Sequence, residues 1–392
     1  MRESVLKLRS GRNGILRPAH PWIYKGQLLR PELPIKGGSI VSVWTPDNKF
    51  VGRGYYNPTS DITVRLLTFK DEPLDGEFID QKIKEAIARR ASMAQKTNAY
   101  RVVFSEADSL PGLIIDLYGD TAVFQILTLG MERFTEAVVG AIRKNTAARY
   151  IYEKSDGPFR RQEALKVVKS WHGDKGNRYI QISEGKARFS IDIYEGHKTG
   201  FYLDQRSSRL AMHTVSKGKT VLDLFSYIGA FAIHAALSSA VGVTAVDIKE
   251  DWLALGRKNA ALNNVSDRIE FVKADAFKYL DAAVSSGKKF DVIIVDPPSF
   301  LKTRRLLESA SRGYKELNCK AMKCLNEDGV LATFSCSHNM PNAVFSAALK
   351  EAAARAGREL TILKRCRQGE DHPISRWIPE TEYLKGYFFR VS

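Results

Sequence analysis

One cysteine and an Asp-Pro-Pro loop are the residues of this sequence best suited to covalent chemistry. Asp296 opens the segment Asp-Pro-Pro-Ser-Phe300, and Cys336 lies in Thr-Phe-Ser-Cys-Ser-His338. A thiolate that adds to carbon 6 of a pyrimidine makes carbon 5 nucleophilic enough to attack a methyl sulfonium. That chemistry needs a thiol at the edge of the base and an acid or hydrogen-bond donor near N3, and Cys336 and Asp296 suit these roles. The alternative for Cys336 is a small buried packing residue.

The loop that follows Asp296 predicts a flat ligand. Pro297 and Pro298 force an extended turn with few backbone donors, so the loop is expected to be rigid and to present the ring of Phe300 to a base. Methyltransferases that act on amino groups of bases use a similar loop of Asp or Asn, two prolines and an aromatic residue. The motif therefore indicates a base but not the atom that is modified.

The thiol of Cys336 needs activation in this scheme. A free thiol titrates at about pH 8.5, so we expect nearby basic groups to favour the thiolate. His338 is either such an aid or an ordinary residue at the end of a strand. The other cysteines, Cys319, Cys324 and Cys366, show no CxxC spacing and no accompanying histidine cluster, so no metal site is expected.

Three aspartates at the ends of predicted strands indicate a nucleoside cofactor that carries an amino group. The segment Val221-Leu-Asp-Leu-Phe-Ser-Tyr-Ile-Gly-Ala-Phe231 places Asp223 in a strand and Gly229 in the tight turn after it. A dinucleotide fold would carry GxGxxG here, whereas one glycine and an aspartate suit a cationic ligand such as S-adenosylmethionine. Asp247 ends the next strand and is placed to accept hydrogen bonds from ribose hydroxyls, and Asp275 follows the third strand, near the adenine amino group. Each aspartate alone is also a candidate helix cap, but three at successive strand ends form a stronger pattern.

A doubly wound α/β domain is needed to position these residues. From about residue 190 onward, short apolar runs alternate with helical stretches, which predicts a mainly parallel sheet flanked by helices. The expected strands are 220–224, 243–247, 269–272, 290–295 and 329–334, and the expected helices are 230–238, 252–263 and 309–325. Ligands in such sheets bind at the carboxyl ends of the strands, where the aspartates and Cys336 stand.

Two smaller modules are expected before this domain. In residues 1–70, apolar runs at 39–44, 50–56 and 62–67 separated by Gly and Pro turns predict a compact β-barrel. Residues 71–190 mix the two kinds of element and predict an α+β module. Its expected helices are 80–95 and 132–144, and its expected strands are 101–104, 113–116, 122–127 and 150–152. The predicted domains are therefore 1–70, 71–190 and 191–392.

The charge of the chain indicates a polyanionic partner. The 392 residues carry a formal net charge of +16, and residues 1–70 hold 12 Lys and Arg against 4 Asp and Glu. Such a field attracts nucleic acid, whose phosphates supply most of the affinity. We expect no membrane span, because no apolar run approaches the ~18 residues that one requires. The scarcity of cysteines and a basic start without an apolar secretory core favour the cytoplasm.

Several motifs together resemble the ribosomal RNA large subunit methyltransferase I family of 5-methylcytosine enzymes. The resemblance spans nearly the whole chain and rests on Ala19-His-Pro-Trp-Ile-Tyr24, Ser105-Glu-Ala-Asp-Ser-Leu-Pro-Gly-Leu-Ile-Ile-Asp116, Gly200-Phe-Tyr-Leu-Asp-Gln-Arg206, Asp371-His-Pro and Tyr383-Leu-Lys-Gly386. It implies a PUA domain at the N-terminus, a central α+β domain and a Rossmann-like domain that uses S-adenosylmethionine. It also implies large-subunit (23S) ribosomal RNA as the substrate and, from the resemblance only, a homodimer.

The resemblance adds residues to the expected cofactor site. The stretch before the Rossmann-like domain lines the S-adenosylmethionine pocket in the family, and the strand-end loops complete it. The full expected set is Phe201, Asp204, Gln205, Arg206, Asp223, Phe225, Ser226, Gly229, Asp247, Asp275 and Asp296. The turn departs from the family pattern at Ser226 and Ile228, where Cys and Thr are expected, and we expect this to affect affinity more than the class of reaction.

Three other functions stay open from the sequence. An amino-group methyltransferase, such as one that makes N2-methylguanine, predicts that Cys336 is dispensable. An RNA-binding ribosome assembly factor that has lost catalysis predicts RNA binding without affinity for S-adenosylmethionine, and the series of aspartates argues against it. A methyltransferase of small molecules is disfavoured by the basic N-terminal module.

Overall fold

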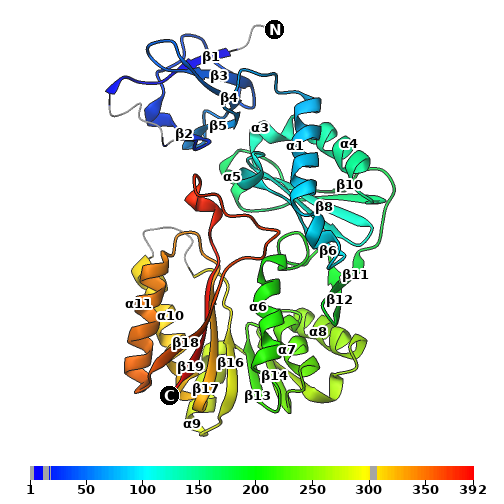
Figure 1. Ribbon diagram of the computed structural model, residues 1–392, viewed down its shortest axis with the longest axis vertical. Coiled ribbons are helices and arrows are strands. Elements are labelled where there is room, and N and C mark those ends of the chain that lie inside the picture. The colour runs from blue at the N-terminus through cyan, green and yellow to red at the C-terminus, as the bar shows by residue number, and fades with distance from the viewer. Residues whose placement is uncertain (1–3, 12–16, 18, 301–306) are drawn as a thin grey trace. The chain divides into compact units, whose positions relative to one another are not determined.

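The computed structural model describes residues 4–11, 17, 19–300 and 307–392 (Figure 1). The chain forms two compact units, each made of three segments. The first unit consists of Met1–Ile182, Ile191–Leu203 and Glu370–Thr381, and the second consists of Ser183–Ser190, Asp204–Gly369 and Glu382–Ser392. The chain therefore leaves each unit and returns to it more than once.

The first unit begins with a five-stranded sheet in the order β1-β3-β4-β5-β2. Its strands are β1 (Ser4–Lys7), β2 (Trp22–Tyr24), β3 (Ile40–Trp44), β4 (Phe50–Tyr56) and β5 (Ile62–Thr68), and a 3-10 turn, η2 (Lys25–Gln27), follows β2. Alternate side chains such as Ile23, Val41 and Val64 are fully buried and form a small core of their own. The strands expected at 39–44, 50–56 and 62–67 correspond to β3, β4 and β5.

A second five-stranded sheet follows in the order β10-β9-β8-β7-β6. Its strands are β6 (Ala99–Phe104), β7 (Leu113–Tyr118), β8 (Thr121–Ile126), β9 (Tyr150–Ser155) and β10 (Val168–Trp171). The helices of this module are α1 (Gly76–Arg89), α2 (Ala91–Ala94), α3 (Leu129–Glu132), α4 (Thr135–Asn145) and α5 (Phe159–Gln162), with a 3-10 turn at η3 (Ser105–Asp108). Ile83 of α1, Val138 of α4 and Phe124 of β8 lie in one buried core, so these two helices cover one face of the sheet. The expected α+β module is thus present, although the single helix expected at 80–95 is divided into α1 and α2.

Buried contacts join the first sheet to the module that follows it. The hydroxyl of Tyr55 in β4 donates to the backbone oxygen of Pro111 at 2.6 Å and lies 2.7 Å from the hydroxyl of Thr128. A methyl group added at Gly130 would clash with the ring of Tyr55. The two modules of the first unit therefore share packing that needs a glycine.

Segments from later in the chain complete the first unit. The backbone N–H of Arg101 donates to Asp371 Oδ2 at 3.0 Å, and Glu380 accepts from Arg17 at 2.9 Å and lies 3.0 Å from the ring of His20. This returning segment ends in the turn η8 (Pro379–Thr381). A two-stranded sheet, β11 (Tyr179–Glu184) and β12 (Ala187–Asp192), carries the chain through the change of unit.

The second unit is built on a seven-stranded sheet in the order β15-β14-β13-β16-β17-β19-β18. Its strands are β13 (Thr220–Leu224), β14 (Gly242–Asp247), β15 (Ile269–Lys273), β16 (Phe290–Val295), β17 (Leu325–Ser335), β18 (Leu360–Cys366) and β19 (Lys385–Val391). The first five are parallel to one another, whereas β19 runs antiparallel to both β17 and β18. The expected doubly wound, mainly parallel sheet is therefore confirmed, with an antiparallel pair at one edge.

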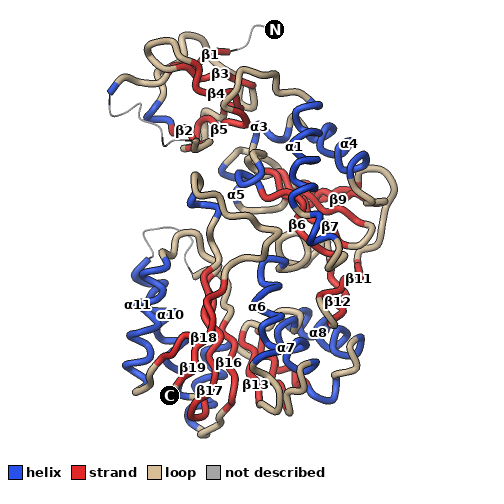
Figure 2. The backbone as a smooth tube through the Cα atoms, viewed as in Figure 1, coloured by secondary structure: helices blue, strands red, loops and turns tan. Residues whose placement is uncertain are grey.

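Helices cover both faces of this sheet (Figures 1 and 2). They are α6 (Arg206–Leu210), α7 (Ala230–Leu237), α8 (Glu250–Leu262), α9 (Ala276–Ser285), α10 (Leu307–Lys323) and α11 (Asn342–Ala356), with 3-10 turns η4 (Leu203–Gln205), η5 (Ala211–Thr214) and η6 (Ser266–Arg268). Leu280, Tyr314 and Phe345, from α9, α10 and α11, share one core with apolar residues of the strands, while α7 and α8 pack on the opposite face. The expected helix 309–325 corresponds to α10, but Leu325 already begins β17.

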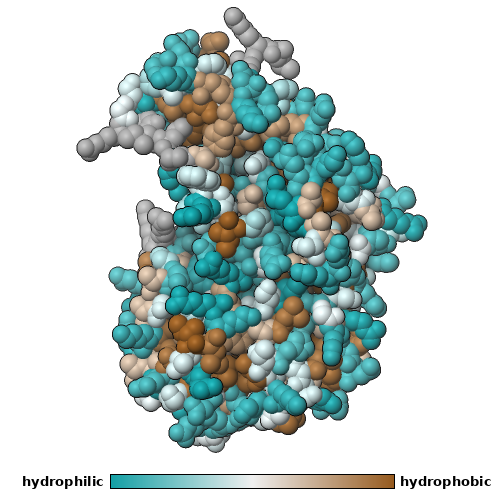
Figure 3. All heavy atoms as spheres, viewed as in Figure 1, coloured by the Kyte–Doolittle hydropathy of each residue, from teal (hydrophilic) through white to brown (hydrophobic). Residues whose placement is uncertain are grey.

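Hydrophilic side chains dominate the face drawn in Figure 3, with hydrophobic ones in small groups among them. Among the described residues, every helix is too short or too polar to cross a lipid bilayer.

Candidate active site

The carboxyl ends of four parallel strands bring the predicted site residues of the second unit to one edge. Leu224 of β13 is paired with Val246 of β14 and with Val295 of β16, and Val295 is paired with Thr333 of β17. The residues that follow these strand ends are therefore neighbours: the 225–229 turn, Asp247, the Asp296 loop and Cys336. This is the edge at which doubly wound sheets bind ligands.

The turn after β13 has a strained backbone. Phe225, Tyr227 and Gly229 all have positive φ angles, of 60°, 52° and 74°. The N–H of Tyr227 donates to Asp247 Oδ2 at 2.9 Å, which ties the turn to the end of β14. A Cβ at Gly229 would lie 3.0 Å from the ring of Phe271, so this position requires glycine for two reasons. Strain of this kind persists where the surrounding structure fixes it, and it is common at ligand sites.

Asp223 is a buried carboxylate with an incomplete set of partners. It is 1% exposed; Oδ2 accepts from the N–H of Ala232 at 3.1 Å, and Oδ1 has no hydrogen-bond partner among the described residues. Burial raises the pKa of Asp223 well above its usual range, and the negative charges of Asp296 and Asp247 raise it further. A cationic or hydrogen-bond-donating ligand would relieve this state, so the geometry fits a cofactor with an amino group.

Among the other buried polar side chains of the second unit that have no hydrogen-bond partner in the described part of the chain, two belong to the expected cofactor set. They are the amide of Gln205, both of whose polar atoms lack a hydrogen bond, and the hydroxyl of Ser226. Buried polar atoms in native proteins almost always have partners, so such a group indicates a place where a water molecule or a ligand binds. Gln205 and Ser226 thus fit the expected cofactor site, and their contact with the cofactor stays a prediction.

The other residues of the 200–206 stretch have structural partners. Asp204 Oδ2 accepts from the hydroxyl of Tyr383, and the backbone oxygen of Asp204 accepts from the N–H of Gly369 at 2.9 Å. The guanidinium of Arg206 lies 3.6 Å from the buried carboxylate of Glu184. Phe201 belongs to the first unit and is 1% exposed. These contacts hold the stretch in place and leave the roles of Phe201, Asp204 and Arg206 toward the cofactor as predictions.

Asp247 and Asp275 both serve the backbone. Asp247 accepts from the N–H groups of Tyr227 and Lys249, and Asp275 caps α9 by accepting from Phe277 and Lys278 through Oδ1. The capping bonds give Asp275 a structural role that does not need a ligand. The expected bonds of these two aspartates to ribose and adenine stay predictions.

Cys336 lies directly after β17, with Asp296 at the end of the neighbouring strand. Tyr314 of α10 lies beneath both, and its hydroxyl donates to Ser335 Oγ at 2.9 Å. Burial raises the pKa of Tyr314, the hydrogen bond that it donates to Ser335 lowers it, and the nearby Cys336 and Asp296 raise it further. Cys336 is partly exposed, unlike Cys324 and Cys366, which are buried. The thiol and the carboxylate are therefore within electrostatic reach of a common neighbour.

The Pro-Pro loop presents less of its aromatic ring than expected. Pro297 is buried and Pro298 is exposed. The ring of Phe300 is partly buried, with its centroid 4.9 Å from that of Tyr314 and 6.3 Å from that of Phe277. Phe300 is thus part of the core edge, and its expected contact with a base stays a prediction.

Comparison with known proteins decides the family. Residues 6–69 match the family of PUA-like domains, and residues 153–390 match the S-adenosylmethionine-dependent methyltransferases. The ribosomal RNA large subunit methyltransferase I of Shewanella frigidimarina is 39% identical, with 98% of this chain and 99% of the relative covered. That of Klebsiella pneumoniae is 38% identical, with 98% of both chains covered. This chain belongs to the ribosomal RNA large subunit methyltransferase I family.

The resemblance, the fold class and the cofactor expected from the sequence are thereby confirmed. A solved methyltransferase in complex with SAH shares the fold, with a TM-score of 0.85 at 24% identity over 100% of both chains. The family's PUA-like domain corresponds to the β1–β5 sheet, and its methyltransferase domain contains the seven-stranded sheet. S-adenosylmethionine is the methyl donor of this domain.

Sequence reasoning missed three side chains near the thiol of this family member. The sequence pattern indicates only that Tyr314 lies in a helix. Tyr383 and Lys385 belong to a motif that supports the family resemblance, but the motif assigns them no role. Tyr383 stacks on His338, with ring centroids 4.9 Å apart, and Lys385 Nζ donates to the backbone oxygen of Ser337 at 2.7 Å. The motif itself was the available signal for the last two.

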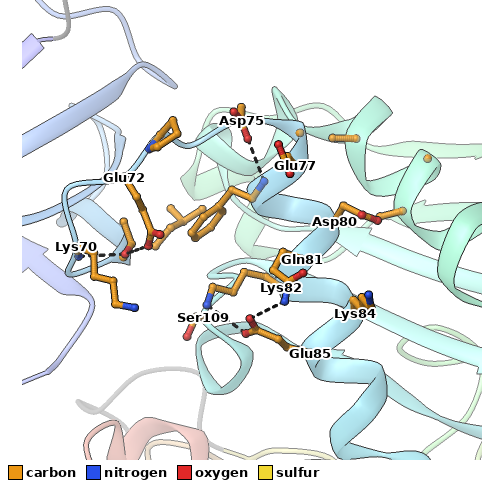
Figure 4. Close-up of a pocket in the computed structure, with 18 of the residues that line it drawn as sticks. Lys70, Glu72, Asp75, Glu77, Asp80, Gln81, Lys82, Lys84, Glu85 and Ser109 are labelled. Carbon is orange, nitrogen blue, oxygen red and sulfur yellow. Dashed lines mark hydrogen bonds and ion pairs between the residues drawn. The ribbon is translucent and has the colours of Figure 1, made fainter.

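A separate pocket of about 1080 Å³ lies in the first unit, between the end of β5, α1 and α4 (Figure 4). Four of its charged side chains form pairs, since Lys82 lies 3.2 Å from Glu85 and Lys144 lies 2.6 Å from Asp80. Asp75 is used as the N-cap of α1. These five side chains therefore have partners within the chain.

Proposed function

We propose that this chain methylates carbon 5 of a cytosine in large-subunit ribosomal RNA through a covalent bond between Cys336 Sγ and carbon 6 of the base. The observation that carries the proposal is the position of Cys336. It is a partly exposed thiol at the carboxyl edge of the sheet, one strand away from the Asp296 loop. An enzyme that methylates amino groups needs the loop but not the thiol.

The side chains of the site divide the work in this proposal. S-adenosylmethionine, when bound, supplies the methyl group. Asp223, Gln205 and Ser226 would hold it, because each has at least one buried polar atom without a hydrogen-bond partner in the described structure. Cys336 adds to carbon 6, so that electron density reaches carbon 5, and it leaves again once the carbon 5 proton has been removed. Asp296 would hold the base near N3.

The basic N-terminal module would supply the affinity for RNA. It combines a PUA-like fold with an excess of Lys and Arg over Asp and Glu, and neutralising phosphates is the main source of affinity for nucleic acid. Chemistry at carbon 6 requires the cytosine to leave its stack or to be unpaired. Methylation of a fully paired, unflipped cytosine would contradict this part of the proposal.

The experiment compares the wild type with Cys336→Ala on unmodified large-subunit ribosomal RNA, using labelled S-adenosylmethionine and mass spectrometry of the digested nucleosides. We expect the wild type to make 5-methylcytidine and the variant to make none while binding the cofactor equally well. Cys319→Ala, at a partly exposed cysteine on α10, is the matched control and should keep full activity. If Cys336→Ala methylates as well as the wild type, the thiol only packs and an amino-group mechanism takes its place.

Two further expectations accompany this function. A ribosomal RNA substrate places the protein in the cytoplasm, which fractionation of cells would test. The family resemblance suggests a homodimer, and sedimentation velocity of the full chain would distinguish it from a monomer.

A further inference from the structure

The Tyr383-Leu-Lys-Gly386 motif places a lysine beside Cys336. Lys385 is the first residue of β19, which runs antiparallel to β17, and it is paired with Ser335. Ser335 directly precedes Cys336. The strand pairing alone therefore fixes the backbone of Lys385 beside the residue that precedes Cys336, although the two residues are far apart in the sequence.

The side chain of Lys385 extends along the backbone segment that carries Cys336. Its Nζ donates to the backbone oxygen of Ser337 at 2.7 Å, across a separation of 48 residues, so the chain extends from the level of Ser335 to the level of Ser337. Cys336 lies between these two residues. A Cβ at Gly386 would clash with the ring of Phe334, so only glycine lets β19 approach β17 this closely next to Lys385.

The charges around Lys385 favour an ion pair with the thiol. Burial lowers the pKa of Lys385 to about 8, while the interactions with Cys336 and Glu382 raise it. Glu382 is itself exposed and lies 3.7 Å from the exposed guanidinium of Arg367. Cys336 and Glu382 are thus the acidic groups that act on Lys385, and Glu382 has a cation of its own beside it.

We propose that Lys385 is the basic group that holds Cys336 as a thiolate before it attacks the base. The S–H bond of Cys336 breaks and an N–H bond forms on the amine of Lys385, while the electron pair stays on sulfur. No further reactant is needed for this transfer. Lys385 acts through Cys336 and is a positioning residue, and this role rests on the covalent mechanism proposed above.

The proton transfer from Cys336 also excludes Lys385 as the base that acts on carbon 5. Once it has taken the proton of the thiol it is an ammonium group, so it cannot also remove the proton from carbon 5 of the base. It remains as the counter-ion to which the sulfur returns when the S–C bond breaks. A different group must therefore act as the base for carbon 5.

The experiment measures the thiolate directly in the full chain, without methyl transfer. Iodoacetamide alkylates thiolates, and peptide mass spectrometry separates Cys336 from the other cysteines, so the alkylation rate is followed from about pH 6 to about pH 10, a range that brackets an ordinary thiol. The variant is Lys385→Gln, whose amide can still donate to the Ser337 oxygen but carries no charge. We expect its alkylation curve to move up by about one pH unit or more, and its rate at neutral pH to fall about tenfold.

Two controls keep the result specific. Lys385→Arg retains the positive charge and should keep the wild-type midpoint, while Lys364→Gln, at an exposed lysine on β18, should change nothing. Circular dichroism and binding of SAH check that Lys385→Gln is folded, and Lys385→Met replaces it if it is not.

The outcomes separate this inference from the proposed function. If Lys385→Gln alkylates with the wild-type midpoint, Lys385 does not activate the thiol and the inference is wrong, whatever the activity. If the curve moves but Cys336→Ala still methylates RNA, the ion pair exists and the covalent mechanism is wrong. If both proposals hold, the activity of Lys385→Gln should recover at a pH above about 9, where an ordinary thiol ionises unaided.

Discussion

Asp116 and Asp223 are two buried aspartates on strands of different sheets, and they differ in how their charge is matched. Asp116 in β7 is fully buried and accepts two hydrogen bonds of 2.8 Å from the guanidinium of Arg101, together with one from the hydroxyl of Thr199. Asp223 in β13 is 1% exposed and accepts a single backbone bond, from Ala232.

The difference distinguishes a charge that is matched within the chain from a charge that needs a ligand to match it. A buried charge is tolerated when it is paired and hydrogen-bonded, which Asp116 achieves within the chain. Burial raises the pKa of Asp223, and the carboxylates of Asp296 and Asp247 raise it further. One oxygen of Asp223 has no partner in the described structure. Burial alone therefore does not identify a site; burial with missing partners does.

Replacing Asp116 with Ala should have the largest effect on stability. The guanidinium of Arg101 would be left buried without its partner, and breaking a buried ion pair in this way costs about 3–5 kcal/mol. Urea denaturation of the full chain measures the loss. Asp120→Ala, two residues beyond β7 and exposed, is the control and should change the free energy of unfolding by less than about 0.5 kcal/mol. If Asp116→Ala changes the free energy of unfolding by a similarly small amount, the ion pair of Asp116 does not stabilise the fold and the comparison with Asp223 is wrong.

Replacing Asp223 with Asn should instead weaken cofactor binding without weakening the fold. The amide keeps an acceptor for Ala232 and removes the charge that a cationic ligand would match, so affinity for S-adenosylmethionine should fall about 10- to 100-fold. The free energy of unfolding without cofactor should be unchanged or higher. Isothermal titration calorimetry and urea denaturation measure the two quantities. A loss of stability as large as that of Asp116→Ala would mean that Asp223 is a structural charge after all.

The pH dependence of stability should sharpen the same contrast. Burial raises the pKa of Asp223 in the folded state. Its contribution is therefore fully present below the unfolded value of about 3.9 and is lost as pH rises through the higher folded value. Without cofactor, Asp223→Asn should match the wild type near pH 4 and become the more stable of the two as pH increases. A difference that is constant across this range would show that Asp223 does not titrate on folding.

Ser226→Ala should give the smallest effect. The hydroxyl is buried with no partner in the described structure, so its removal should leave the stability without cofactor unchanged or slightly higher. A single neutral hydrogen bond to the cofactor would contribute about 1 kcal/mol, which predicts a change in affinity of no more than about tenfold. No change at all would remove Ser226 from the site.

Much of the second unit could be predicted from the sequence because local pattern and topology agree there. The buried runs of β13 and β16 are continuous and apolar, and the rule that parallel strands bind ligands at their carboxyl ends then brought Asp223, Asp296 and Cys336 together. The first residue of one helix was also predicted: the helix expected at 230–238 is α7, Ala230–Leu237.

Two of the strands that were missed lack such a pattern. The five central residues of β18 are all exposed, and β1 has four residues with only one of them buried. These strands exist because a neighbour pairs with them, which a single sequence does not reveal. For the same reason Lys385 could not be assigned to the site, since it reaches Cys336 through the antiparallel return of β19. Asp275 shows another limit of the sequence. An aspartate after a strand can cap the next helix or contact a ligand, and the sequence pattern is the same in both cases.

The interleaved composition of the two units has a consequence for synthesis on the ribosome. Chains generally fold from the N-terminus as they emerge, and a domain made of one early segment can complete its fold before the later segments are made. Here Arg90 and Arg101 of the first unit bind Asp371, through its backbone oxygen and its carboxylate, and Glu380 binds Arg17. The paired residues are 270 to 363 positions apart in the sequence. The early part of the first unit therefore lacks these contacts until residues 371–380 have been made, so a nascent chain stalled before residue 370 should carry a first unit that is still open to proteases.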